Sequence, residues 1–377
     1  MKLFSKLSAI VASSALALTG LVAIATPAKA ADCTGTIAIM APLTGGAAFI
    51  GAEQSNFAQV AIDAVNAKSG SKFKFKEFDT QINAAVAASL APQVVSDSSI
   101  IGVVGPAGSQ EVLAVGGLFS SNDLAFVSPS ATRTSLSAGT YTSFFRPIGS
   151  DIAQARTGAT YMAKNLKAKE VVVIEEKTAY GTGLANEIVD ALKKLNVKVT
   201  KLVVNENNAD YAAVVTRVPK SADFVYVTFQ VAAKSENVAQ ELIKQKKKAI
   251  VFGSDGSDSS TFKTPGTYLT GFAGDVSNLP VAKAAFDAYK AKTNNARAGT
   301  FGPPAYVAAQ VIAEAAVRAC AAGKIGDRLA VIAEIKKTNI KKSILGTAIR
   351  FSANGDVING RFTVFQTQKD GSRKQLS

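Results

Sequence analysis

The sequence has no histidine and only two cysteines among its 377 residues. Without an imidazole, a Ser-His-Asp hydrolase, a histidine-ligated zinc site and acid–base catalysis by imidazole are all excluded. The same absence argues against Cys33 or Cys320 as a catalytic nucleophile, because neither has a histidine to activate it. We therefore expect no catalytic residue and no metal site of these kinds.

Long apolar runs are also scarce, and the one that stands out lies in the first thirty residues. Lys2 and Lys6 precede an apolar stretch over residues 10–24, and the Ala-Lys-Ala of residues 28–30 has the small residues of a cleavage site. We predict a cleavable signal peptide over residues 1–30 rather than an uncleaved membrane helix, because no basic flank follows it. No other stretch reaches the eighteen or so apolar residues that a span needs. The mature protein is therefore expected in the periplasm or outside the cell.

If the protein is exported, its two cysteines can form a disulfide, because disulfides form in oxidising compartments. Cys33 precedes the first predicted strand, and Cys320 lies late in an alanine-rich predicted helix. A Cys33–Cys320 disulfide would make those two segments neighbours, and two free buried thiols are the alternative. Lipidation of Cys33 is not expected, because Asp32 stands where a small residue is required.

Positive charge is in excess, with a formal net charge of +14 at pH 7. Part of it belongs to the leader, and the rest is scattered, as in Lys72, Lys74 and Lys76. The chain has no recognisable nucleic-acid-binding motif. We interpret the charge as a solvated basic surface and expect no nucleic-acid partner; an anionic partner surface is the lesser alternative.

Short apolar strands alternate with helical patterns in two successive series. The first series is a strand at 36–40, a helix at 53–68, a strand at 72–78, a helix at 84–96, a strand at 100–104, a helix at 110–120 and a strand at 124–127. The second is a helix at 152–166, a strand at 170–175, a helix at 184–195, a strand at 197–204, a helix at 212–218, a strand at 223–228, a helix at 236–246 and a strand at 249–252. Helices at 280–290, 303–321 and 327–338 follow, and then two strands at 349–351 and 361–366 around a tight turn. The alternation predicts α/β architecture with parallel sheets covered by helices.

Hydroxyl-rich loops follow two strands of the first series. Residues 128–135, Ser-Pro-Ser-Ala-Thr-Arg-Thr-Ser, follow the strand at 124–127, and Gly-Pro-Ala-Gly-Ser at 105–109 follows the strand at 100–104. Loops at the carboxyl ends of parallel strands present backbone N–H groups and short hydroxyls to a polar solute. We predict that these loops form one half of a small-molecule site. Hydroxyl-capped helix starts without a ligand are the alternative.

Short motifs spread along the chain resemble one family. They are IAIMAPLTG at 37–45, IDAVNAK at 62–68, VVG at 103–105, SPSAT at 128–132, YGTGL at 180–184 and NGD at 354–356. In this order, from about residue 35 to residue 366, they are similar to the Leu/Ile/Val-binding proteins, the substrate-binding proteins of branched-chain amino-acid ABC transporters. The resemblance implies a type I periplasmic binding protein with two Rossmann-like lobes and a three-strand hinge.

The resemblance also implies where the lobes begin and end. Crossings near Gly149, Leu279 and Gly360 would give an N-terminal lobe of residues 31–149 plus 280–360 and a C-terminal lobe of residues 150–279 plus 361–377. Both cysteines would then lie in the N-terminal lobe, consistent with a disulfide.

The ligand-binding positions that the resemblance implies are Ser109, Ser130, Ala131, Thr132, Tyr180, Gln230, Asp255 and Phe301. Ser109 and Thr132 match residues that hold the ligand's α-carboxylate, and Ser130 matches one that offers its carbonyl to the α-ammonium. Asp255 matches the acid that binds the ammonium from the other lobe, whereas Tyr180 and Phe301 match aromatic residues that line the cleft.

Three positions depart from the family's pattern. Gln230 stands where a tyrosine is expected, Ile50 follows Phe49 where an aromatic is expected, and Asp255 is shorter than the usual glutamate. These changes bear on which ligand is bound rather than on the scaffold.

We therefore expect a periplasmic protein that captures a small, aliphatic amino acid and delivers it to an inner-membrane ABC permease, as a monomer without a cofactor. A receptor for an amide, a carboxylate or another small solute is one alternative, and a sensor subunit of the same fold is another. An exported hydrolase with a serine–lysine pair is the third, but the chain offers no Ser-x-x-Lys with convincing partners before a helix.

Overall fold

The structure is a computed structural model, and it describes residues 33–272, 274–294 and 299–377. The signal peptide predicted over residues 1–30 lies outside the described residues. These described residues form one compact unit. In the part of the chain that the structure describes, no helix is long and apolar enough to cross a membrane.

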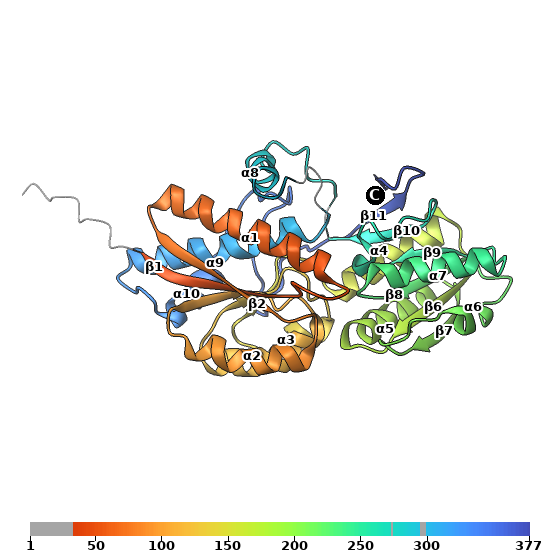
Figure 1. The fold of residues 1–377 in the computed structure, drawn as a ribbon, viewed down its shortest axis with the longest axis horizontal. Helices are drawn as coiled ribbons and strands as arrows, with labels where there is room; N and C mark the ends of the chain where they lie inside the picture. The colour runs from red at the N-terminus through yellow and green to blue at the C-terminus, as the bar shows by residue number, and fades with distance from the viewer. Residues whose placement is uncertain (1–32, 273, 295–298) are drawn as a thin grey trace, which may run out of the picture. The chain divides into compact units, whose positions relative to one another are not determined.

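The first sheet is parallel and five-stranded, in the order β2-β1-β3-β4-β5 (Figure 1). Its strands are β1 (Thr34–Ala41), β2 (Lys72–Asp79), β3 (Ile100–Val104), β4 (Phe126–Val127) and β5 (Phe144–Phe145). Ile37 of β1 lies opposite Phe75 of β2 on one side and Gly102 of β3 on the other. All five residues of β3 are buried, because a central parallel strand is covered on both faces.

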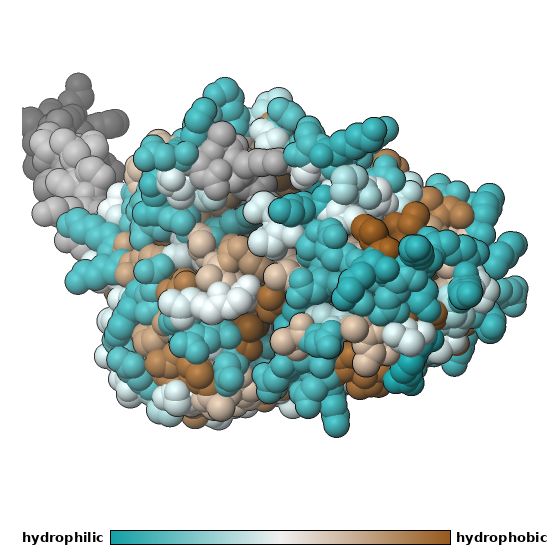
Figure 2. Space-filling view, turned by 45° about the vertical axis from the view of Figure 1, so that its right-hand side comes forward, coloured by the Kyte–Doolittle hydropathy of each residue, from teal (hydrophilic) through white to brown (hydrophobic). Residues whose placement is uncertain are grey.

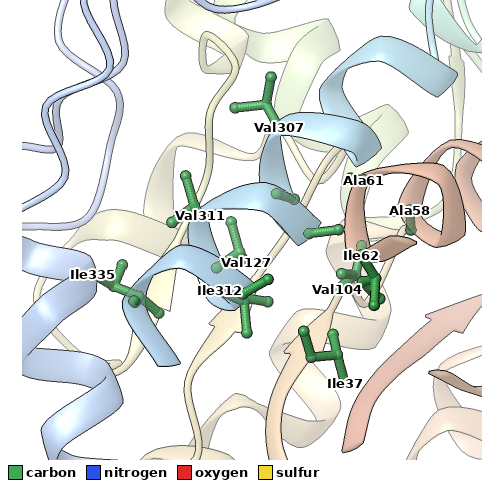
Figure 3. Packing of buried hydrophobic residues seen from close by; sticks show 14 of the residues in the cluster. Ile37, Ala58, Ala61, Ile62, Val104, Val127, Val307, Val311, Ile312 and Ile335 are labelled. Carbon is green, nitrogen blue, oxygen red and sulfur yellow. The ribbon is translucent and has the colours of Figure 1, made fainter. Parts of the chain in front are cut away.

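Helices cover both faces of this sheet, and the alternation of side chains along β1 decides which helix each residue meets. Ile37 and Ile39 pack with residues of α1 (Ala48–Ser69), α8 (Lys283–Thr293), α9 (Gly302–Ala321) and α10 (Arg328–Lys336). Figure 3 shows Ile37 of β1 and Ile62 of α1 near Ile312 of α9 in this core. Ala38 and Met40 instead pack with α2 (Ala84–Ser96) and α3 (Ser109–Ser121).

The second sheet has seven strands in the order β12-β11-β10-β9-β8-β6-β7. They are β6 (Glu170–Glu176), β7 (Lys198–Val204), β8 (Phe224–Thr228), β9 (Ile250–Gly253), β10 (Tyr268–Gly271), β11 (Thr363–Thr367) and β12 (Arg373–Gln375). β6 to β10 are parallel, whereas β11 is antiparallel to β10 and β12 is antiparallel to β11. The predicted α/β class is confirmed, with two antiparallel strands added at one edge.

Helices also cover both faces of the second sheet. Val171 and Val173 of β6 pack with α4 (Asp151–Thr160) and α5 (Ala179–Lys194). Val172 and Ile174 pack on the other face with α6 (Ala212–Thr216) and α7 (Ala232–Lys244). A π-helical turn, Tyr161–Asn165, continues α4 over the rest of the helix predicted at 152–166.

The hairpin predicted between residues 349–351 and 361–366 is wrong. Ile349 and Phe351 make only isolated bridges, to Ile340 and Val357. β11 instead pairs with β10, about a hundred residues earlier, in the second sheet. A local pattern of apolar residues identifies a strand but not its partner, and β10 itself was not predicted.

Helix α5 begins five residues before the predicted start at residue 184. The Thr178 side chain explains this, because its hydroxyl accepts a hydrogen bond from the Gly181 N–H at 2.9 Å and so caps the helix. Tyr180 therefore lies in the first turn of a helix and not in a free loop.

The chain passes from one sheet to the other after β5, after β10 and again before β11. Each passage contributes a buried apolar residue, namely Ile148, Phe272 and Phe362, to one cluster that also holds Ile50 and Phe301. The segments that join the sheets therefore share a core with residues of the candidate site described below.

Cys33 and Cys320 form a disulfide, with their Cα atoms 5.8 Å apart. The bond ties the start of β1 to the end of α9. On the face shown in Figure 2, hydrophilic side chains cover most of the surface and are interrupted by smaller apolar patches, as is usual for a protein surface.

Candidate functional site

A cavity of about 260 Å³, part of it open to solvent, lies at the carboxyl ends of strands from both sheets. Loops after β2, β3 and β4 reach it from the first sheet, and loops after β8 and β9 reach it from the second. The lining residues are Ile50, Ile82, Ala107, Ser109, Ser130, Tyr180, Gln230, Asp255, Gly256 and Phe301. This is where open α/β sheets bind ligands.

Most of the predicted binding residues line this one cavity: Ser109, Ser130, Tyr180, Gln230, Asp255 and Phe301. Ala131 and Thr132 do not line it. Both are fully buried, and Ala131 packs in the core between the first sheet and α2 and α3. Ile82 and Ala107 were not singled out from the sequence, although the loop after β2 was another strand end of the kind that binds ligands.

The two hydroxyl-rich loops are joined to each other by hydrogen bonds. Ser130 Oγ donates to the carbonyl of Ala107 at 2.8 Å, and Ser128 Oγ donates to the carbonyl of Pro106 at 2.6 Å. The Arg133 N–H donates to Ser109 Oγ at 3.2 Å. Because Ser109 Oγ accepts this bond, the hydroxyl keeps its own proton to donate elsewhere.

Gln54 supports this side of the cavity from α1. Its side chain is fully buried and donates from Nε2 to Ser130 Oγ at 2.7 Å. Gln54 was not predicted from the sequence, although its spacing from Phe57, Ala58 and Ala61 places a polar side chain on the buried face of the helix. A buried amide on such a face needs a polar partner.

Asp255 lies at the opposite wall, directly after β9, and only 4% of it is exposed. Its Oδ1 accepts hydrogen bonds from Tyr180 Oη at 2.6 Å and from Gln154 Nε2 at 2.6 Å. Burial raises the pKa of Asp255 to about 6, although these two hydrogen bonds act in the opposite direction. Burial and the charge of Asp255 raise the pKa of Tyr180 well above its usual value, so this phenol remains a donor.

The loops after β8 and β9 approach each other closely at Gly256. A Cβ atom at this position would collide with the carbonyl of Phe229 and lie 2.8 Å from the Cα of Gln230. The glycine therefore allows Asp255 and Gln230 to reach the same cavity from neighbouring strands.

Phe301 forms an apolar part of the cavity just before α9 begins. Its ring packs edge-on against Phe49 and Phe272, with centroids 5.8 and 5.4 Å away. The backbone on either side of it is held by the buried Glu53 carboxylate, which accepts the N–H groups of Gly299 and Gly302 at 2.8 and 3.2 Å. Burial raises the pKa of Glu53 to about 7.

Arg146 fixes the loop after β4 from behind. Its guanidinium is fully buried, is paired with Asp356, and donates to the carbonyls of Ala131 and Arg133 at 3.1 and 3.0 Å. This ion pair therefore ties the NGD motif at 354–356 to the loop after β4. No local pattern in the sequence indicated the ion pair.

Asp151 lies at the first position of α4, fully buried, and its N–H donates to the carbonyl of Thr132 at 2.8 Å. Burial raises the pKa of Asp151 to about 7; Asp255 acts in the same direction, and Thr132 and Arg146 act against it. The cavity is therefore flanked by carboxyl groups. In the described part of the chain, no group of His, Cys, Asp and Glu side chains is placed to hold a metal ion.

Comparison with known proteins gives one consistent family. A family model described as "Periplasmic binding protein" matches residues 34–372. The Leu/Ile/Val-binding protein homolog 3 of Brucella melitensis is 31% identical over 90% of this chain and 93% of its own length. The Leu/Ile/Val-binding protein BraC3 of Rhizobium johnstonii is 32% identical over 88% of this chain and 91% of its own length.

A solved structure shows the same fold. The branched-chain amino acid transporter substrate-binding protein of Streptococcus pneumoniae, in complex with isoleucine, superposes with a TM-score of 0.81. The alignment covers 91% of this chain and 99% of that one, at 23% identity.

The chain therefore belongs to the periplasmic binding protein family, a family of substrate-binding proteins. Within that family its curated relatives are Leu/Ile/Val-binding proteins, so the resemblance read from the sequence motifs is confirmed.

Proposed function

We propose that the protein is an exported solute receptor that binds one small, aliphatic amino acid in this cavity and delivers it to an inner-membrane ABC permease. One observation carries the proposal: the cavity places a buried carboxylate, Asp255, across from the hydroxyls of Ser109 and Ser130. The relatives named above, which are Leu/Ile/Val-binding proteins, support an amino acid as the ligand.

The two walls suit the two charges of a zwitterion. Asp255 binds the α-ammonium, since a shielded carboxylate pairs strongly with a cation. The α-carboxylate lies against Ser109 at the start of α3, where hydroxyls and backbone N–H groups stabilise an anion. Thr132, which is fully buried and does not line the cavity, would reach the ligand only after a local rearrangement. Ser130 offers its carbonyl to the ammonium.

The apolar lining takes the ligand's side chain. Ile50, Ile82 and Phe301 supply most of this surface.

The cavity lies between two lobes that we propose to be residues 31–149 plus 280–360 and residues 150–279 plus 361–377. Each sheet draws its strands from one of these sets, which supports the division. Rotation about the segments between the sheets would open the cavity to the periplasm, where cleavage after Ala30 releases the protein as a monomer.

Thermal unfolding of the ligand-stripped mature protein tests the proposal, with each of the twenty amino acids and with short amides and carboxylates added in turn. A ligand at about 100 times its Kd should stabilise the protein by about 2.7 kcal/mol. We expect a shift with aliphatic amino acids that is lost in Asp255→Asn and kept in Asp63→Asn, which removes the same charge from an exposed helix position. A shift with an amide or a carboxylate alone would overturn the amino-acid assignment.

A further inference from the structure

The apolar part of the cavity is interrupted by one amide, the side chain of Gln230. Gln230 lines the cavity and is only 8% exposed. The next residue, Val231, packs against the cluster that contains Ile50 and Phe301, and Ile82 packs against the same cluster. Gln230 therefore lines the same cavity as Ile50, Ile82 and Phe301, the apolar residues that we propose to receive a ligand's side chain.

Gln230 is held in place by a second glutamine, Gln110, from the first turn of α3. Gln110 Nε2 donates to the carbonyl of Ile82 at 2.8 Å and to Gln230 Oε1 at 2.9 Å. Gln230 Nε2 donates in return to Gln110 Oε1 at 3.3 Å. The two amides thus face each other from elements of the two different sheets.

A count of donors and acceptors shows which hydrogen-bonding groups of the two glutamine side chains remain unused. A primary amide has two N–H donors, and its oxygen can accept two bonds. Gln110 uses both of its N–H groups. Among the hydrogen bonds between described residues, the Gln230 side chain uses one N–H and one acceptor position, so one of each remains for a ligand.

We propose that Gln230, held by Gln110, makes the site select small amino acids whose side chain carries a hydroxyl or an amide over aliphatic amino acids of the same shape. This inference rests on the proposed function, an amino-acid receptor, and replaces the aliphatic side chain expected there by a polar side chain of similar shape. An aliphatic side chain would cover the free N–H of Gln230 without bonding it, and a buried donor left without a partner is costly. A site built to bond a polar group rejects the analogue that lacks it.

Pairs of amino acids with nearly the same shape test this selection. Threonine and valine form one pair, and asparagine and leucine form the other. The Kd of each is measured by calorimetry on the ligand-stripped mature protein and on Gln230→Met, which keeps an unbranched side chain of similar length. Gln230→Leu serves as a second variant if Gln230→Met does not fold.

We expect the wild-type protein to bind threonine about tenfold more tightly than valine, a difference of about 1.4 kcal/mol. In Gln230→Met the ratio of the two Kd values should fall to about one or reverse. The ratio is the decisive quantity, because a general effect on folding or on closure changes both Kd values alike.

Other outcomes separate the possible failures. Equal weakening of threonine and valine in Gln230→Met would mean that the glutamine pair only joins the two lobes, which overturns the inference. Tighter binding of valine than of threonine by the wild type would overturn it as well. Binding of no amino acid at all would instead overturn the proposed function.

Discussion

The loop after β4 of the first sheet contacts one face of α5. Ala179, Gly183 and Glu187 lie four residues apart and so share one face of the helix. The Arg133 guanidinium donates to the carbonyl of Ala179, and Thr134 Oγ1 donates to Glu187 Oε1 at 3.2 Å. The loop after β4 is thus joined to the helix that carries Tyr180.

Gly183 lies in the middle of this face of α5, and its lack of a side chain allows Arg133 to approach the helix closely. A Cβ there would lie 3.2 Å from Arg133 Nη1 and 3.0 Å from Asp151 Oδ2, so a larger side chain would have to displace these two side-chain ends. The contacts of Arg133 and Thr134 with α5 join residues of the two lobes proposed above, and they would be lost if those lobes moved apart. They therefore contribute to the stability of the closed form and not to that of an open one.

Arg133→Ala is the perturbation that tests this reasoning. A hydrogen bond to a charged group contributes about 1.5–3 kcal/mol net, and because Arg133 is only half-buried we take the lower figure. If only the closed form holds the ligand, a loss of about 1.5 kcal/mol raises the apparent Kd about tenfold. The change should appear mainly as faster dissociation.

Stopped-flow kinetics and calorimetry with the best amino-acid ligand measure the effect. Arg156→Ala is the matched control, because it removes the same charge from an exposed position of α4. Small-angle X-ray scattering of the ligand-free protein should show a more open average form in Arg133→Ala. An unchanged Kd in Arg133→Ala would refute the claim that these contacts stabilise the closed, ligand-binding form.

Three further predictions concern stability and binding. Replacing Cys33 and Cys320 by serine opens a loop that spans a sequence separation of 287 residues and should lower the free energy of unfolding by about 2–5 kcal/mol in urea titrations; an unchanged midpoint would contradict this. Because burial raises the pKa of Asp255 from 3.8 to about 6, the ligand-free protein should lose stability as the pH rises through that range. An ammonium needs the carboxylate, so affinity should fall up to tenfold per pH unit below about 6; an affinity that does not change below that pH would contradict the role of Asp255. Gly256→Ala should abolish binding in the thermal-shift assay, because the added Cβ collides with the carbonyl of Phe229.

Some elements have the bounds that the sequence predicted. The helix at 84–96 and the strand at 100–104 have the predicted bounds. Errors occur where a local pattern does not determine the structure. The Thr178 cap extends α5 toward the N-terminus, and β11 pairs with a strand about a hundred residues away.

In the candidate site, too, some residues could be predicted from a local pattern and others could not. Ser109 and Ser130 were predictable because their loops follow strands, and the ends of parallel strands meet at one edge. Asp255 was predicted from the resemblance to the family. Gln54, Gln154 and the buried Arg146 were not found from the sequence. They reach the site from the sides of helices or from behind a loop, and only the packed structure brings these positions together.

The charges around the cavity bear on which solutes it accepts. Burial raises the pKa of Asp255 to about 6 and that of Asp151 to about 7, so both groups are costly to ionise in the ligand-free protein. The buried guanidinium nearby, Arg146, is already paired with Asp356. A ligand that brings a cation relieves this cost, whereas a simple carboxylate would add negative charge to a wall that already carries two acids. An amino acid supplies the cation beside Asp255 and keeps its own carboxylate at the hydroxyls of the first sheet, so the electrostatics favour a zwitterion over a plain carboxylate as the ligand.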